Sequence, residues 1–145
     1  MAQTMSFGYH GDGGLGDRLL AAVLRGEKTA TSCLVVEYLQ GEPLPRVGEL
    51  LPLVDHQGGV HGVVQITGVS ITPLHLVGDD VARDEGEDFK DAAHWRRDHV
   101  AYWTEVTELV RSDAGDPGWR LRDTEPVVVK RFRLVELREQ SRLAP

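Results

Sequence analysis

The order of the expected secondary-structure elements predicts an α+β fold. One helical pattern is followed by a group of extended patterns, and a second, longer helical pattern is followed by one last extended pattern. This order lacks the regular strand–helix alternation of a doubly wound parallel sheet. A length of 145 residues fits one domain that buries its own core. We expect this single domain to span residues 15–138.

The N-terminal part is expected to contain a flexible segment, a helix and a strand. Residues 1–14 are polar and rich in glycine, so we expect them to be flexible. Apolar residues recur at helical spacing over residues 15–25. Residues 30–38 favour a strand, and their apolar run Leu34-Val35-Val36 is typical of a central strand that is buried on both faces.

The middle of the chain predicts two strands and an acidic turn. Leu50–Val54 and Val60–Ile71 are the strands, and the turn between them, Asp55–Gly59, has two glycines as its pivot. Leu74–Arg83 is expected to form a short helix or an irregular connection. The acidic turn follows at Asp84–Asp88.

The longest periodic segment, Phe89–Arg111, is predicted to form one amphipathic helix. At about 100° per residue, seven residues fall on one face: Ala92, Trp95, His99, Tyr102, Trp103, Val106 and Val110. Asp88 fits the N-cap position. Asp113–Gly118 would end the helix, and Val127–Leu137 is the last predicted strand.

The charge balance argues against tight, non-specific binding of long nucleic acids. The formal net charge is −7, from 16 Lys and Arg against 23 Asp and Glu. A protein that holds long nucleic acid through its phosphates needs a basic face. Basic residues gather only near the C-terminus, at Arg120, Arg122, Lys130, Arg131 and Arg133. This balance favours a small ligand or a short nucleic-acid segment.

The remaining composition predicts a cytoplasmic protein without a metal or a cofactor. Cys33 is the single cysteine, and no signal-peptide pattern is visible, so a reducing compartment is expected. We interpret Cys33 as a small buried hydrophobic residue. No apolar run approaches the roughly 18 residues that span a bilayer. No Cys/His spacing indicates zinc.

A lysine followed by three hydroxyl residues lies where the first helix ends, in Gly26-Glu27-Lys28-Thr29-Ala30-Thr31-Ser32. A deprotonated lysine amine can take the proton of a neighbouring hydroxyl, as in Ser–Lys variants of the catalytic triad. Regular strand geometry would place Lys28 and Ser32 on one face and Thr31 on the other. The alternative is that Lys28 is a solvated cation at a helix C-terminus.

The acidic turn and the following helix supply the other candidates. Glu85 and Glu87 could act as a general acid or base, or hold a ligand amine; alternatively, they complement the dipole of the helix that follows. Trp95 lies nearest the acidic turn and is the candidate to line a pocket and stack on a base. We interpret Trp103 as a core residue. His99 is interpreted as a hydrogen-bonded core histidine rather than a catalyst.

Four segments, in order, resemble the ASCH domain family. They are the G-x-K-x-x-T signature at Gly26–Thr31, the V-G-D/E pattern at Val47–Glu49, the E-G-E…W…H pattern that starts at Glu85 and includes Trp95 and His99, and a closing strand at Pro126–Phe132. The lysine motif alone is a weak signal, whereas the four segments in order are specific. The resemblance covers almost the whole chain, from the first helix to about Leu137.

The resemblance implies a PUA-like fold, which is a small mixed β-barrel flanked by helices, with a nucleic-acid or nucleotide cleft at the lysine motif. Some family members hydrolyse N4-acetylcytidine and release acetate through the motif lysine, the motif threonine and a glutamate. Carried over to this chain, the catalytic residues are Lys28, Thr31 and Glu85, with Glu87 as the alternative glutamate. The candidate substrate-binding residues are Ser32, Glu87, Trp95 and His99.

The leading functional prediction is therefore a hydrolase of a modified nucleoside or a related amide. Other family members are described as ribonucleases, so a metal-independent ribonuclease is the first alternative. A non-catalytic RNA-binding module is the second. The expected partner is a nucleoside, a nucleotide or a short single-stranded RNA, without a membrane. The oligomeric state is left open.

Overall fold

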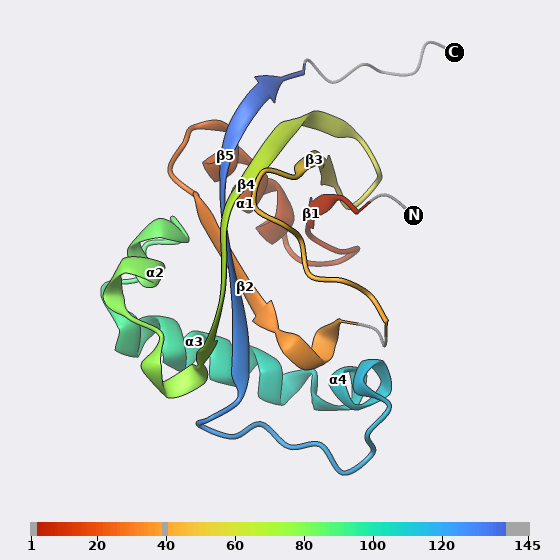
Figure 1. The fold of residues 1–145 in the computed structure, drawn as a ribbon, viewed down its shortest axis with the longest axis vertical. Coiled ribbons are helices and arrows are strands. Elements are labelled where there is room, and N and C mark those ends of the chain that lie inside the picture. The colour runs from red at the N-terminus through yellow and green to blue at the C-terminus, as the bar shows by residue number, and fades with distance from the viewer. Residues whose placement is uncertain (1–2, 39–40, 139–145) are drawn as a thin grey trace.

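The computed structural model describes residues 3–38 and 41–138 as a curled, five-stranded sheet with helices packed against it (Figure 1). The strand order is β1-β3-β4-β5-β2. The strands are β1 (Met5–Phe7), β2 (Ala30–Leu34), β3 (Leu50–Asp55), β4 (Val60–Pro73) and β5 (Pro126–Leu137). β1 pairs with β3 in parallel, and the other pairs are antiparallel. The sheet forms a half-barrel, which confirms the predicted α+β class and mixed barrel.

The helices cover the sheet on two sides and create two apolar cores. They are α1 (Leu15–Leu24), α2 (Asp79–Asp84), α3 (Ala92–Glu105) and α4 (Thr107–Ala114), with the short 3₁₀ helices η1 (Val35–Glu37) and η2 (Leu74–Leu76). One core contains Trp95 and Trp103 of α3, and the other contains Val23 of α1. β5 contributes Val129 to the first core and Phe132 to the second.

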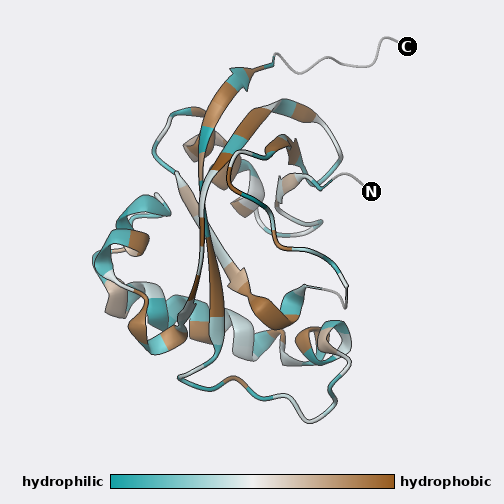
Figure 2. Ribbon diagram, in the orientation of Figure 1, coloured by the Kyte–Doolittle hydropathy of each residue, from teal (hydrophilic) through white to brown (hydrophobic). Residues whose placement is uncertain are grey.

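The hydropathy of the residues agrees with this arrangement of the sheet and the helices. In Figure 2, the strands carry much of the hydrophobic colour, whereas α2 is largely hydrophilic. Within the described residues, no helix is both long enough and apolar enough to cross a membrane.

The structure contains a strand, β1, that the sequence did not predict. The sequence prediction treated residues 1–14 as flexible and began the domain at residue 15. Residues 1–2 lie outside the described residues, but Met5 and Phe7 are buried in the core beside α1. Their strand pairs with β3 through the register Met5↔Leu53. A strand of three residues is too short for a periodic signal, so the sequence pattern did not indicate it.

The strand predicted over residues 30–38 ends at Leu34 and continues as η1. The Glu37 carboxylate accepts a hydrogen bond from the Leu34 backbone N–H at 3.2 Å, which closes the turn. The apolar residues Val35 and Val36 therefore do not continue a central strand, and that part of the prediction was wrong.

The predicted long helix begins later and is divided. The Asp91 side chain accepts a hydrogen bond from the His94 backbone N–H at 2.8 Å and is the N-cap, whereas Asp88 has a left-handed φ of 62°. The helix breaks at Val106, where the Thr107 hydroxyl donates to the Thr104 carbonyl at 2.7 Å. The prediction of one helix with Asp88 as its N-cap was therefore wrong.

The acidic turn after α2 lies directly against the lysine motif, and Gly86 permits this approach. Gly86 has a left-handed φ of 66°, and a Cβ there would lie 2.5 Å from the Glu27 carbonyl oxygen and 2.9 Å from Lys28 Cα. The Thr29 backbone N–H also donates to the Asp84 carbonyl at 2.8 Å. Only glycine fits this position without moving one of the two segments.

Replacing Gly86 with alanine is expected to lower the free energy of unfolding by about 2–5 kcal/mol, as the sum of left-handed strain and overpacking. Urea denaturation measures this loss. Gly58→Ala is the matched control, since Gly58 also has a positive φ (85°) but has open space around its Cβ position. The control should lose only about 1–2 kcal/mol. Equal losses in the two variants would contradict the close packing at Gly86.

Candidate functional site

The lysine motif turns inward after α1. The Lys28 backbone N–H donates to the Ala22 carbonyl at 3.1 Å, so the chain folds back over the end of the helix. The Lys28 side chain enters the protein and is only 1% exposed. Its amine lies 5.7 Å from the centroid of the Phe7 ring of β1, within the range of a cation–π contact. The interpretation of Lys28 as a solvated cation was therefore wrong.

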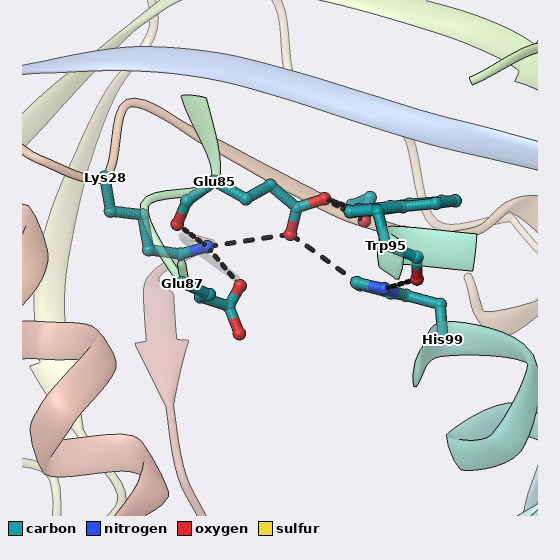
Figure 3. A network of polar contacts seen from close by, with 6 residues as sticks. Lys28, Glu85, Glu87, Trp95 and His99 are labelled. Atoms are coloured by element: carbon teal, nitrogen blue, oxygen red, sulfur yellow. Dashed lines mark hydrogen bonds and ion pairs between the residues drawn. The ribbon is translucent and has the colours of Figure 1, made fainter. Parts of the chain in front are cut away.

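The Lys28 amine faces three oxygen atoms of the acidic turn (Figure 3). It donates to the Glu85 backbone carbonyl at 3.1 Å and to Glu87 Oε2 at 3.1 Å. Glu85 Oε1 lies 3.7 Å away. Two of the three donors of the lysine ammonium are therefore used in hydrogen bonds, and the third contact, to Glu85 Oε1, is an ion pair.

The Glu85 carboxylate is the centre of the network in Figure 3. Its Oε2 atom accepts hydrogen bonds from the Ser32 hydroxyl at 2.9 Å and from the Trp95 indole Nε1–H. Its Oε1 atom faces Lys28 Nζ and His99 Nε2, each at 3.7 Å. Glu85 itself is 1% exposed. Partners from β2, α3 and the turn after α1 therefore share one buried carboxylate.

His99 is oriented by α3 so that both ring nitrogens are used. Its Nδ1 lies 2.8 Å from the Trp95 carbonyl, an acceptor, so Nδ1 carries a proton. The ring stacks on the Trp95 indole at a centroid distance of 4.1 Å. Burial by itself lowers the pKa of His99, but its interaction with the Glu85 carboxylate outweighs burial and raises that pKa above 6.5. Relative to a free histidine, the shift favours the imidazolium form, in which Nε2–H is directed to Glu85.

The pKa values of Glu85 and Glu87 are shifted in opposite directions. Burial raises the pKa of Glu85, but the interaction with His99 and the charge of Lys28 outweigh it and bring that pKa below 4.5. For Glu87, burial outweighs the charge of Lys28, and the Glu85 charge adds to it, so the pKa of Glu87 lies above 4.5. Glu85 is thus a fixed anion, whereas Glu87 is the carboxylate that can more readily take up a proton.

These groups lie at a pocket of about 510 Å³. Aromatic side chains from three parts of the chain line it, namely Phe7, Tyr9, Phe89, Tyr102 and Trp103. The ionisable side chains that line it are Lys28, Glu37, Glu85, Glu87, Asp98 and His99. The volume is within the range of about 300–1,000 Å³ typical of small-molecule sites.

Six of the seven sequence-predicted site residues line this pocket: Lys28, Thr31, Ser32, Glu85, Glu87 and His99. Trp95 does not line it. It is 0% exposed, and its indole ring is covered by His99 and core residues, so it has no free face on which a base could stack. Among the hydrogen bonds of the described residues, none joins the Lys28 amine to Thr31.

Sequence reasoning missed several lining residues. Phe7 belongs to the short strand β1, and Glu37 follows an apolar run that resembled a continuous strand. Trp103, interpreted as a core residue, is 2% exposed yet forms part of the wall. An acidic residue directly after the run Val35-Val36 was the one available signal for Glu37.

The basic residues near the C-terminus do not form part of this pocket. Arg131 instead pairs with Asp80 and Asp84 of α2, at 2.9 and 2.5 Å. Within residues 3–38 and 41–138, no group of three or more His, Cys, Asp or Glu side chains could hold a metal ion.

Comparison with known proteins relates the chain to one family. The family model of the ASCH domain matches residues 3–136. An ASCH domain from Lactobacillus crispatus JV V101 is 28% identical, with a TM-score of 0.73 over 93% of this chain and 82% of that chain. A protein from Enterococcus faecalis V583 is 24% identical, with a TM-score of 0.74 over 95% of this chain and 83% of that chain. No curated protein matches the chain.

Removing the buried amine should destabilise the protein strongly. Lys28→Met leaves the Glu85 carboxylate buried with less compensation, and breaking a buried ion pair costs about 3–5 kcal/mol of unfolding free energy. Adding Glu85→Gln to Lys28→Met should restore part of the loss, because the uncompensated charge is then gone. Urea denaturation measures both. Lys90→Met, at an exposed lysine, is the control and should change stability by no more than about 0.5 kcal/mol. A similar loss in Lys28→Met and Lys90→Met would contradict the network.

The protonation of His99 predicts a loss of stability with rising pH. Because the pKa of His99 is raised above 6.5 in the folded protein, its contribution is fully present below that value and is lost as pH rises through the folded pKa. Denaturant unfolding of the wild type should therefore give a lower unfolding free energy at pH 8.5 than at pH 6. His99→Gln should reduce this difference. The same pH dependence in both proteins would show that His99 is not the group responsible.

Proposed function

Because this chain belongs to the ASCH domain family, we propose that it is a hydrolase that removes an acyl group from the exocyclic nitrogen of a modified nucleoside of the N4-acetylcytidine type. The observation that carries the proposal is the Lys28 amine, held 3.1 Å from Glu87 Oε2 in a pocket with aromatic walls. Planar bases bind well between aromatic rings. A cytoplasmic location, in keeping with the free thiol of Cys33, is part of the proposal.

The charge of the pocket favours an amide over a phosphodiester. Four carboxylates, of Glu37, Glu85, Glu87 and Asp98, line the same space as Lys28 and His99. A phosphate group would meet this surplus of negative charge, whereas the N–H groups of an acylated base or a released amine would find acceptors. ASCH domains are thought to bind RNA, and a nucleoside within a single strand presents the same base. The ribonuclease alternative has no comparable support.

In the proposed first step, a proton moves from the Lys28 ammonium to the Glu87 carboxylate as substrate excludes water from the pocket. The neutral amine then takes the proton of the Thr31 hydroxyl while its oxygen attacks the acyl carbon. The C–N bond breaks, and the proton returns through Lys28 to the leaving amine. This produces the free nucleoside and an acyl ester on Thr31.

In the second step, water attacks the Thr31 ester under the same base. Its proton reaches the threonine oxygen, and the C–O bond to Thr31 breaks. Acetate and one proton leave, and the proton held by Glu87 returns to Lys28, which restores the enzyme. Each turnover thus consumes one amide and one water. General acid–base help of this kind contributes roughly 10²–10⁴-fold to the rate.

The two glutamates have different parts in this proposal. Glu85 is 1% exposed and already faces four donors, so it acts through Lys28 and His99 as a positioning residue. The Glu87 side chain is 23% exposed, and among the described residues its one hydrogen-bonding partner is the Lys28 amine. Glu87 therefore has the free acceptor that can hold the exocyclic N–H of the substrate. The direct role assigned to Glu85 on the family pattern passes to Glu87.

Purified protein is expected to release acetate from N4-acetylcytidine, as measured by chromatographic detection of cytidine. Thr31→Val keeps the side-chain shape but removes the nucleophile, and should lower kcat at least about 10²-fold. Thr29→Val is the matched control, because Thr29 is in the same motif but does not line the pocket. Wild-type protein that releases no cytidine, or a Thr31→Val variant as active as Thr29→Val, would refute the proposed reaction.

A further inference from the structure

One carboxylate of the pocket has no part in the proposed reaction. Glu37 is the last residue of η1 and lines the same pocket as Lys28 and Glu87. Lys28, which binds Glu87, lies just before β2, whereas Glu37 lies in η1 after the other end of that strand. The two carboxylates are therefore separated by the length of β2, which gives the pocket two polar ends.

Glu37 is held in place by the fold itself. Its Oε1 atom accepts the Leu34 backbone N–H at 3.2 Å, and the Trp103 side chain lies beside the carboxylate. A carboxylate has about four acceptor positions, and the Leu34 bond fills one of them. Within the described parts of the chain, no Lys, Arg or His side chain forms an ion pair with Glu37. It is a fixed, partly buried acceptor whose free positions call for donors from a ligand.

Tyrosine and tryptophan side chains surround this end of the pocket. Tyr102 is a neighbour of Glu37, since burial and then the Glu37 charge raise the pKa of Tyr102. Tyr102 and Trp103 both line the pocket and come from α3. Their rings can cover the apolar faces of a ligand whose polar groups meet the Glu37 carboxylate.

A cytidine has polar groups at two ends, and this matches the two polar ends of the pocket. If the acylated nitrogen of the base lies at Lys28 and Glu87, the opposite end of a cytidine is its sugar. A ribose carries two neighbouring hydroxyl donors there, and a carboxylate that accepts from the ribose 2′-hydroxyl is the device that dinucleotide-binding sites use. A 2′-deoxyribose offers one hydroxyl fewer to the same acceptor.

We propose that Glu37 determines substrate specificity by accepting hydrogen bonds from the 2′- and 3′-hydroxyl groups of a ribose, so that the pocket prefers ribonucleosides to 2′-deoxyribonucleosides. The inference rests on the proposed function, because the reacting amide at Lys28 is what turns the sugar toward Glu37. Glu37 is a binding residue in this scheme and takes no part in proton transfer.

Calorimetric titration with cytidine and 2′-deoxycytidine tests the proposal without any turnover. Wild-type protein should bind cytidine about tenfold more tightly, as expected for one hydrogen bond to a charged group. Glu37→Gln keeps the shape but makes the acceptor neutral, which roughly halves the strength of such a bond. The preference should then fall to about threefold. Glu37→Ala should abolish it, and thermal melting checks that each variant is folded.

Glu105→Gln is the matched control. Glu105 is exposed near the end of α3 and acts on Tyr102 by its charge, but it does not line the pocket. This variant should keep the tenfold preference. Equal affinity of wild-type protein for the two nucleosides, a full preference in Glu37→Ala, or no binding of either nucleoside would overturn the proposal.

The outcomes also separate this inference from the proposed reaction. A ribose preference without acetate release would support the role of Glu37 and refute the hydrolase. Acetate release with equal kcat/KM for N4-acetylcytidine and its 2′-deoxy form would support the hydrolase and refute the role of Glu37.

Discussion

The buried Glu85 carboxylate is the constraint on which the site depends. Taking a carboxylate out of water costs several kcal/mol unless its acceptor positions are filled. Here Ser32 of β2, Trp95 and His99 of α3, and Lys28 after α1 all face it. The turn after α2 can therefore hold its position only while these separate elements are assembled. The contacts that hold these elements together are therefore also contacts that build the pocket.

This constraint divides the polar groups of the pocket into two kinds. Glu85 is fully buried and fixes the orientation of its partners. Glu87, Thr31 and Glu37 line the pocket with acceptors or hydroxyls that are less completely used. Chemistry and specificity are expected from this second kind, because a ligand can reach those groups without breaking the network that supports Lys28.

The sequence predicted most of the candidate site but not the burial of Lys28. The family motifs identified Lys28, Glu85 and His99 as candidate residues. The alternating apolar residues predicted the later strands to within a few residues. Whether Lys28 meets solvent depends on the close contact at Gly86, which lies far away in the sequence. Similarly, η1 depends on one hydrogen bond from Glu37, and β1 is too short for a periodic pattern. Such features arise from tertiary contacts, which local patterns do not encode.

The proposed function requires that the pocket at Lys28 and Glu87 holds the acylated base. A crystal structure of the Thr31→Val protein soaked with N4-acetylcytidine would test it most directly, since this variant should bind substrate without consuming it. We expect the acetamide group within about 3 Å of the Lys28 amine or the Glu87 carboxylate, with the base between aromatic rings. A nucleoside bound elsewhere on the sheet, or with its sugar at Lys28, would refute the proposed function.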